Sequence, residues 1–149
     1  MTNASNIIIR PATEKDLPLL NAWCYLNGMD NLPSSEGVSV AAGVCAPDEP
    51  LGFIRIVQGK NGFAHVNPVV VDPEHQTQGI GRALTAWALE NHGELRFISR
   101  GSSLGFYENL GAQKVGWGDI DLGVTDDCIG CPMRAECNPQ PMKLVEISL

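Results

Sequence analysis

A stretch with two closely spaced glycines has the residue types of an anion-binding site. A run of three valines, Val69–Val71, ends a predicted strand, and a helix is expected to begin near Gly79. The first amides of a helix have no intrahelical partners, and Gly79 and Gly81 let a ligand approach them closely. The helix dipole adds positive potential there, so the stretch predicts a phosphate site, to which Arg82 adds a full charge.

The spacing of these glycines distinguishes the stretch from two common phosphate loops. A dinucleotide-binding loop needs Gly-x-Gly-x-x-Gly and a mononucleotide-binding loop needs Gly-Lys-Ser/Thr, and the stretch has neither pattern. Its pattern is Gln76-x-x-Gly79-x-Gly81, directly after a strand, and it resembles the pyrophosphate-binding signature of the GNAT acyltransferase family. The resemblance implies that acetyl-CoA binds to Gln76, Thr77, Gln78, Gly79, Ile80, Gly81 and Arg82.

A second stretch also resembles this family. Residues 106–112, Phe-Tyr-Glu-Asn-Leu-Gly-Ala, are similar to the second GNAT motif, commonly Phe-Tyr-x-x-x-Gly-Phe. The resemblance implies that Tyr107 protonates the thiolate that leaves during acyl transfer, because a phenol with a pKa near 10 can donate at neutral pH. The alternative is a tyrosine that only packs. Arg100 stands where many members carry a cofactor-holding asparagine, so it contacts either the cofactor phosphates or the substrate.

Acyl transfer to an amine also needs a base and a donor for the developing oxyanion. His65 titrates in the useful pH range and lies on the predicted strand from Phe63 to Val71, where the family's base often lies, although that base is usually a glutamate. We therefore predict His65 as the base, directly or through water. The alternative is a histidine with a structural hydrogen bond. The oxyanion donor is expected to be a backbone amide near Val71.

The same strand is expected to hold the pantetheine arm of the cofactor. In the family this strand splays from its next neighbour, and the pantetheine pairs with the opened edge. The resemblance therefore implies backbone contacts at Val69, Val70 and Val71. Pro68 fits a split there because proline cannot donate to a strand ladder, although a simple β-bulge would also account for it.

Three of the five cysteines lie close together near the C-terminus. Cys128, Cys131 and Cys137 have the spacing Cys-x2-Cys-x5-Cys, in a segment (125–140) that lies outside the family pattern. Cys-x2-Cys lets two thiolates hold one ion, but the segment has no obvious fourth ligand. Zinc is the favoured interpretation, and an iron–sulfur cluster, a redox pair and plain reduced thiols remain open.

The elements that must position these residues can be read along the chain. Strands are expected over 7–11, 38–44, 52–57, 63–71, 95–99, 114–124 and 143–149, with helices between 13 and 28, from about 79 to 92 and over 102–112. With the resemblance, this order predicts an α/β (α+β) chain with the GNAT acyl-CoA N-acyltransferase fold. That fold is a mixed, mostly antiparallel sheet of about seven strands flanked by helices. Residues 1–149 are expected to form one domain.

Composition narrows the classes of partner. The net charge of −7 argues against nucleic acid and favours a cationic acceptor such as an amine. No apolar run reaches the ~18 residues of a membrane span, and no signal peptide is recognisable, so a cytoplasmic location and no membrane partner are expected. The acceptor remains open between small-molecule and peptide amines, and a homodimer is a family-level expectation.

The predicted function is N-acetyl transfer from acetyl-CoA to a primary amine. The alternative from another class is a GNAT scaffold without turnover that acts as a metal- or thiol-dependent sensor or binding module, which the cysteine segment suggests. A nucleotide-binding module that uses the same loop is a third hypothesis, and it predicts that ATP competes as well as CoA.

Overall fold

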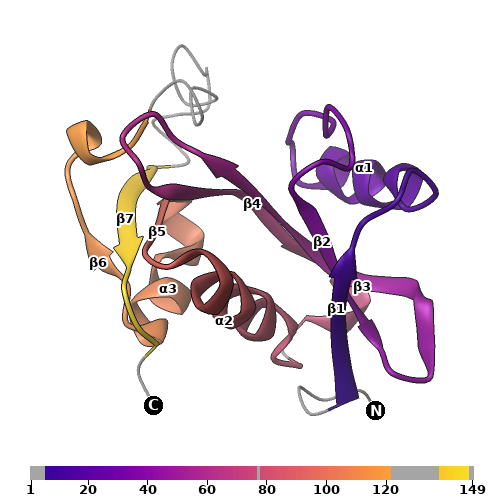
Figure 1. The fold of residues 1–149 in the computed structure, drawn as a ribbon. Helices are drawn as coiled ribbons and strands as arrows, with labels where there is room; N and C mark the ends of the chain where they lie inside the picture. The colour runs from indigo at the N-terminus through magenta and orange to yellow at the C-terminus, as the bar shows by residue number, and fades with distance from the viewer. Residues whose placement is uncertain (1–5, 77, 122–137, 148–149) are drawn as a thin grey trace. The chain divides into compact units, whose positions relative to one another are not determined.

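The structure, a computed structural model, describes residues 6–76, 78–121 and 138–147. In chain order (Figure 1) the elements are β1 (Ile7–Pro11), α1 (Leu17–Leu26), β2 (Val38–Gly43), β3 (Ala46–Gln58), β4 (Ala64–Val71), α2 (Ile80–His92), β5 (Leu95–Ser99), α3 (Leu104–Leu110), β6 (Gln113–Lys114) and β7 (Gln140–Leu144). The described residues also include the short 3-10 turns η2 (Pro73–His75), η3 (Gly101–Ser103) and η4 (Trp117–Asp119).

The described strands form one seven-stranded sheet in the order β1-β2-β3-β4-β5-β7-β6. Strand β4 pairs with β5 in parallel, whereas β1 with β2, β2 with β3, β5 with β7 and β6 with β7 pair antiparallel. The predicted fold class, a mixed and mostly antiparallel sheet with helices, is therefore confirmed.

The chain divides into two compact units, and neither is a continuous stretch. The first contains Met1–Arg55 and Pro68–Trp87, and the second contains Ile56–Asn67 and Ala88–Leu149. The change from one to the other inside β4 falls directly before Pro68, the proline that the strand pattern singled out. The single domain expected over residues 1–149 stays a prediction.

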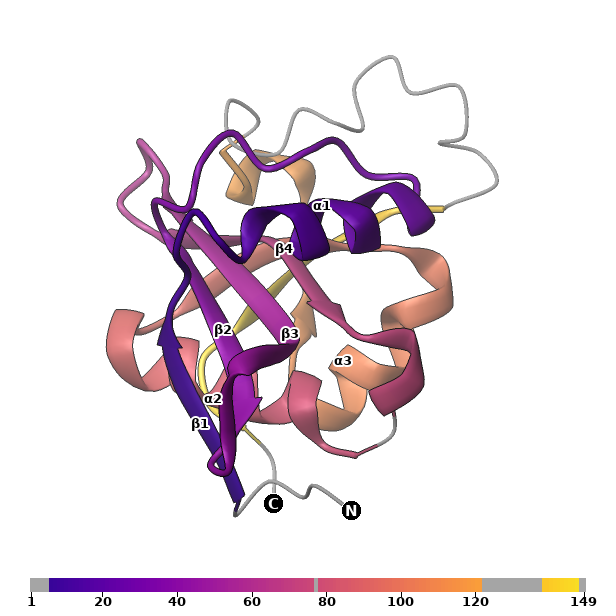
Figure 2. The same ribbon diagram turned by 90° about the vertical axis from the view of Figure 1, so that its right-hand side faces the viewer.

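In the first unit, α1 covers one face of the strands (Figure 2). The buried cluster beneath it takes Leu20, Trp23 and Cys24 from the helix, Val38 and Val40 from β2, Phe53 from β3 and Val70 from β4. The rings of Trp23 and Phe53 stack with their centroids 6.4 Å apart. The apolar residues of α1 recur at helical spacing, so they bury one stripe of the helix against this face.

The other face of the same strands receives the start of α2 at a glycine. A Cβ atom on Gly52 would lie 2.9 Å from the carbonyl oxygen of Val70, 3.1 Å from Ile80 and 3.3 Å from Leu84. Strand residues alternate between faces, so Gly52 points toward α2 while its neighbour Phe53 points toward α1. Gly52 therefore lets α2 pack directly on β3.

The hairpin between β2 and β3 differs from the prediction. The sequence predicts a strand over 52–57, but β3 begins six residues earlier, at Ala46. The register shifts twice, because Ala41 pairs with Gly52, Ala42 with Pro50 and Gly43 with Ala46. Such bulges accommodate residues that cannot join a regular ladder, and Pro50 is one of them.

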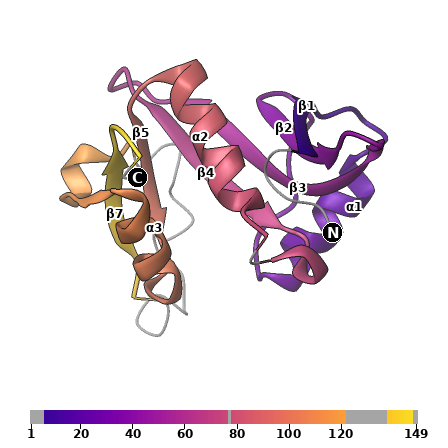
Figure 3. The ribbon, with the colours of Figure 1, turned by 90° about the horizontal axis from the view of Figure 1, so that it is seen from below.

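The second unit is built around β5, which lies between β4 and β7 (Figure 3). Five residues of β5 pair with β7, from Leu95 with Leu144 to Ser99 with Gln140. The strand predicted over 114–124 is wrong in its described part, because β6 is confined to Gln113–Lys114. The chain turns at η4 instead, where the carboxylate of Asp119 accepts a hydrogen bond from the amide of Gly116 at 3.2 Å.

Candidate functional site

The glycine stretch begins a helix as predicted. Gly79 has a φ of +80°, a left-handed conformation that favours glycine. The amide of Ala83 donates to the carbonyl of Gly79 at 3.0 Å, and this bond closes the first turn of α2. The amides of Ile80 and Gly81 come before that bond, in the first turn of α2, where a helix gives its amides no partner of its own. They are the amides that an anion site at this helix start would use.

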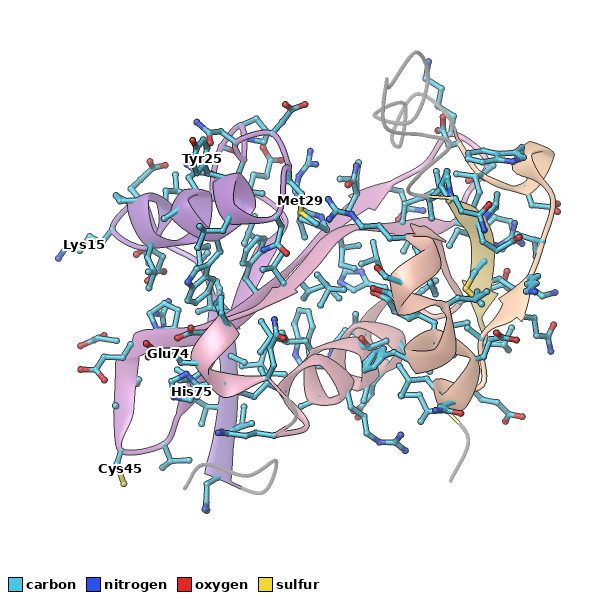
Figure 4. All side chains as sticks on the ribbon, turned by 180° about the vertical axis from the view of Figure 1, so that it is seen from behind. Lys15, Tyr25, Met29, Cys45, Glu74 and His75 are labelled. Atoms are coloured by element: carbon cyan, nitrogen blue, oxygen red, sulfur yellow. The ribbon has the colours of Figure 1, made fainter. Side chains whose placement is uncertain are left out.

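The turn that leads into this loop is held on β3. The amide of Asp72 donates to the carbonyl of Leu51 at 2.9 Å, and the carboxylate of Asp72 accepts from the amide of Glu74 at 3.0 Å. The other oxygen of that carboxylate contacts Nδ1 of His75 at 3.1 Å, a contact that the sequence pattern did not identify. Figure 4 shows Glu74 and His75 on this turn. These bonds fix where the chain enters the loop.

The side chains of the loop differ in their surroundings. Gln76 and Arg82 are exposed, whereas Ile80 is buried and anchors the helix start. Gln78 is half-buried, and its carbonyl oxygen Oε1 is buried without a hydrogen-bond partner. Thr77, also predicted to bind the cofactor, lies outside the described residues.

The strand predicted to hold the pantetheine pairs with its parallel neighbour over a short distance. Ala64 pairs with Leu95 and His65 pairs with Arg96, although β4 continues to Val71 and β5 to Ser99. Of the three predicted contact residues at 69–71, the side chain of Val70 is buried in the core, and the other two valines are half-buried. Their cofactor contacts stay predictions.

Tyr107 lies in α3 with its ring against two phenylalanines. The ring centroid is 4.6 Å from that of Phe97 and 5.1 Å from that of Phe106. Burial raises the pKa of Tyr107 to about 12, so the phenol keeps its proton throughout the neutral range. The residue as a whole is half-buried, but its ring lies against these two phenylalanine rings, and such apolar surroundings disfavour the charged phenolate. Among the described residues, none forms a hydrogen bond with its hydroxyl.

His65 is fully buried, and both nitrogens of its ring have hydrogen-bond partners. Nδ1 lies 2.9 Å from the carbonyl oxygen of Phe63, and Nε2 accepts from the amide of Asp121 at 3.0 Å. A general base needs a nitrogen that the substrate or a water molecule can reach. The base assignment is untested, and this geometry favours the alternative of a structural hydrogen bond.

The remaining predicted site residues are Arg100 and the three cysteines near the C-terminus. Arg100 is exposed directly after β5, and its contact with the cofactor stays a prediction. Cys128, Cys131 and Cys137 lie outside the described residues. Within the described ranges, no group of three or more His, Cys, Asp or Glu side chains is placed to hold a metal ion. Cys45, at the tip of the β2–β3 hairpin (Figure 4), is a free and exposed thiol.

The glycine loop belongs to the first unit, whereas His65, Arg100 and Tyr107 belong to the second.

In the described part of the chain, no helix is both long and apolar enough to cross a membrane.

Comparison with solved structures shows that this fold is shared. The protein Rv2747 from Mycobacterium tuberculosis, solved with CoA, superposes with a TM-score of 0.73 at 16% identity over 94% of this chain and 99% of its own. N-acetylglutamate synthase from Neisseria gonorrhoeae, solved with coenzyme A and N-acetyl-glutamate, gives 0.72 at 15% identity over 96% of this chain and 35% of its own. Ard1 from Thermoplasma volcanium gives 0.68 at 16% identity over 96% and 99%. At such low identity these similarities show the fold alone.

The family is shown by the sequence itself. Residues 35–111, more than half of the chain, match the family described as Acetyltransferase (GNAT) domain. A search of curated proteins found no match. The chain therefore belongs to the GNAT acetyltransferase family. This membership confirms the predicted enzyme class, an acetyltransferase.

Proposed function

We propose that this acetyltransferase moves the acetyl group of acetyl-CoA to a primary amine, and that the loop from Gln76 to Arg82 binds the cofactor's pyrophosphate. The observation that carries the proposal is the start of α2. The left-handed Gly79 and the hydrogen bond from Ala83 to its carbonyl leave the next amides at the positive end of the helix. The CoA complexes of the structurally similar proteins from M. tuberculosis and N. gonorrhoeae support this choice of cofactor.

Each step of the reaction has a proposed group. The amine nitrogen attacks the thioester carbonyl carbon, and a backbone amide near Val71 donates to the developing oxyanion. The carbon–sulfur bond then breaks, and the leaving thiolate takes a proton from Tyr107, whose pKa of about 12 keeps that proton available at neutral pH. The phenolate regains a proton from solvent before the next turnover. Arg100 is proposed to contact the cofactor phosphates. Because both ring nitrogens of His65 are bonded, we assign the amine's proton to solvent.

The acceptor is proposed to be a small-molecule or peptide amine. The net charge of −7 supports a cationic acceptor over an anionic one. One structurally similar protein is named spermidine N-acetyltransferase, and another, Naa50, was solved with a bisubstrate analogue that contains a peptide. Both kinds of acceptor therefore belong in a first screen. A cytoplasmic location and a homodimer remain part of the proposal.

Calorimetric titration with acetyl-CoA tests the cofactor site. The wild-type protein should bind, and Gly81→Glu should abolish binding, because a carboxylate at the start of α2 repels and blocks the phosphates. Gly43→Glu is the matched control, since a Cβ at Gly43 meets nothing within 4 Å and the variant adds the same charge. Undetectable binding in the wild type, or equal binding in Gly81→Glu, would contradict the proposal.

We also propose that Cys128, Cys131 and Cys137 hold a metal ion, with zinc as the first choice. Support comes from the spacing alone, because two cysteines separated by two residues suit one tetrahedral ion. Metal analysis of the purified protein with and without Cys131→Ser tests this, and equal metal content in both would contradict it.

The alternative function is a sensor without turnover. Such a protein would bind CoA, but it would not convert acetyl-CoA to free CoA with any amine in the screen.

A further inference from the structure

The two edges of the described sheet differ in length and in composition. Strand β6 forms one edge, and it consists of two exposed residues, Gln113 and Lys114. Strand β1 forms the other edge, and it contains Ile7, Ile8 and Ile9 in succession, all of them half-buried. Natural sheets keep an edge strand from pairing with another chain by making it short or charged, and β6 has both properties. Strand β1 has neither property over its three isoleucines.

The hydrogen bonds between β1 and β2 determine which backbone groups of β1 point away from the sheet. The amide of Ala12 donates to the carbonyl of Val38, and the amide of Val44 donates to the residue directly before β1, both at 2.9 Å. Bonded and non-bonded pairs alternate along an antiparallel ladder, and β1 pairs with β2 without a shift in register. The even-numbered residues of β1 therefore bond to β2. The N–H and C=O groups of Ile7 and Ile9 point outward instead.

This outward row of groups ends at Pro11. Proline has no N–H, and the carbonyl of Pro11 accepts a hydrogen bond from Nη1 of Arg10 at 3.0 Å. The guanidinium of Arg10 also donates to the carboxylate of Asp16 at 2.8 and 3.0 Å, so its charge is paired within the chain. Among the described residues, none bonds to the outward groups of Ile7 and Ile9. These two residues therefore offer a donor and an acceptor each to another strand.

We propose that β1 is the interface of a homodimer, in which the β1 strands of two copies pair antiparallel across a twofold axis at Ile8. In that register Ile7 of each copy faces Ile9 of the other, and each pair exchanges both of its N–H to C=O hydrogen bonds. The three isoleucines read the same in both directions, so the edge is complementary to itself. The inference rests on the homodimer of the proposed function and names its interface.

The distribution of charge is consistent with a second copy as the partner. Each copy has a net charge of −7, which repels another copy, but residues 6–9 carry no charged side chain. Salt screens the repulsion between whole copies, whereas it does not weaken apolar contacts or backbone hydrogen bonds between strands. Added salt should therefore strengthen the dimer. An interface held by ion pairs would respond in the opposite direction.

Sedimentation velocity and amide exchange of the full chain test the interface together. One pair of strands buries less than about 1,000 Å², so the dimer should be weak and should form with rising concentration over a roughly hundredfold range. The amides of Ile7 and Ile9 should exchange more slowly with solvent as the dimer forms. The amides of Ile8 and Arg10, which bond to β2, should be slow at every concentration.

Two substitutions at one position separate the backbone bond from the side chain. Ile9→Pro removes an outward N–H and no bond to β2, a place where an edge strand tolerates proline. Ile9→Ala is the matched control, because it shortens the side chain and keeps the N–H. The Kd of the dimer should rise at least about fivefold more in Ile9→Pro than in Ile9→Ala, since half of the bonds between the copies are lost.

The outcomes distinguish this interface from the other proposals. A dimer that is equally stable in the two variants, or that forms without slowing the amides of Ile7 and Ile9, would show that another surface is used and would overturn the inference. If Ile9→Pro does not fold, amide exchange of the wild type decides. A wild type that binds acetyl-CoA and stays monomeric would overturn both the interface and the homodimer, and would leave the cofactor site standing.

Discussion

Replacing Tyr107 by phenylalanine removes one hydroxyl and keeps the ring. The contacts of that ring with Phe97 and Phe106, at 4.6 and 5.1 Å between centroids, do not use the hydroxyl, and none of the described residues bonds to it. The variant should therefore fold normally. If the phenol protonates the leaving thiolate, the turnover number should fall by roughly 10²–10⁴-fold, which is the usual contribution of a positioned acid.

The pH dependence of turnover is a second test of this role of Tyr107. Because burial raises the pKa of Tyr107 to about 12, the acid stays protonated well above neutral pH. Deprotonation of Tyr107 should therefore not lower wild-type turnover between pH 7 and about pH 10. A phenol at its ordinary pKa near 10 would instead begin to lose its proton, and turnover would decline toward pH 10.

Turnover and acetyl-CoA affinity must be measured together, because the predicted change lies in the rate alone. Tyr25→Phe is the matched control, since Tyr25 is the other of the two tyrosines and the residue is 82% exposed on α1 (Figure 4). Full turnover in Tyr107→Phe would show that the residue only packs. Loss of both turnover and cofactor binding would show that it supports the pocket structurally.

Two further predictions concern the first unit. Gly52→Ala should lower the free energy of unfolding by about 1–3 kcal/mol and weaken CoA binding, because the new methyl group meets the carbonyl of Val70 at 2.9 Å and displaces α2. Urea unfolding and calorimetry check this, with Gly43→Ala as the control, and an unchanged protein would contradict the packing argument. Asp16→Asn should lower the free energy of unfolding by about 1.5–3 kcal/mol at pH 7, because Asp16 accepts two hydrogen bonds from Arg10. Those bonds lower the pKa of Asp16, so its contribution should begin to decline below about pH 4, the ordinary value for Asp, and should be lost as pH falls through the lowered pKa. A variant that is destabilised by the same amount at pH 3 as at pH 7 would refute this.

Features that depend on neighbouring residues could be predicted from the sequence. The helix expected from about Gly79 to 92 occupies Ile80–His92, because its apolar period, its glycines and its ending at Gly93 are all local signals. The positive φ of Gly79 follows from the same pattern. The family motifs added the acetyltransferase class, which no periodicity could supply.

Features that depend on distant residues could not be predicted. The partner of Nε2 of His65 is Asp121, 56 residues away, so the sequence offered only a histidine on a strand. Gly59 makes room for that imidazole by lacking a side chain, and this contact could not be seen in the sequence either. The strand predicted over 114–124 is wrong for a different reason, which is local. Its apolar residues suited a strand, but the bond from Gly116 to Asp119 turns the chain.

The division of the chain into two units, each of two separate stretches, has a consequence for synthesis on the ribosome. The first unit lacks part of its sheet and the start of α2 until Trp87 has emerged, about thirty residues after Arg55. Strand β3 lies beside β4 in the finished sheet, so the nascent chain leaves that edge of β3 unpaired during this delay. At about 5–20 residues per second, the delay lasts seconds, long enough for a chaperone to bind. A fragment that ends at Arg55 should remain in that state.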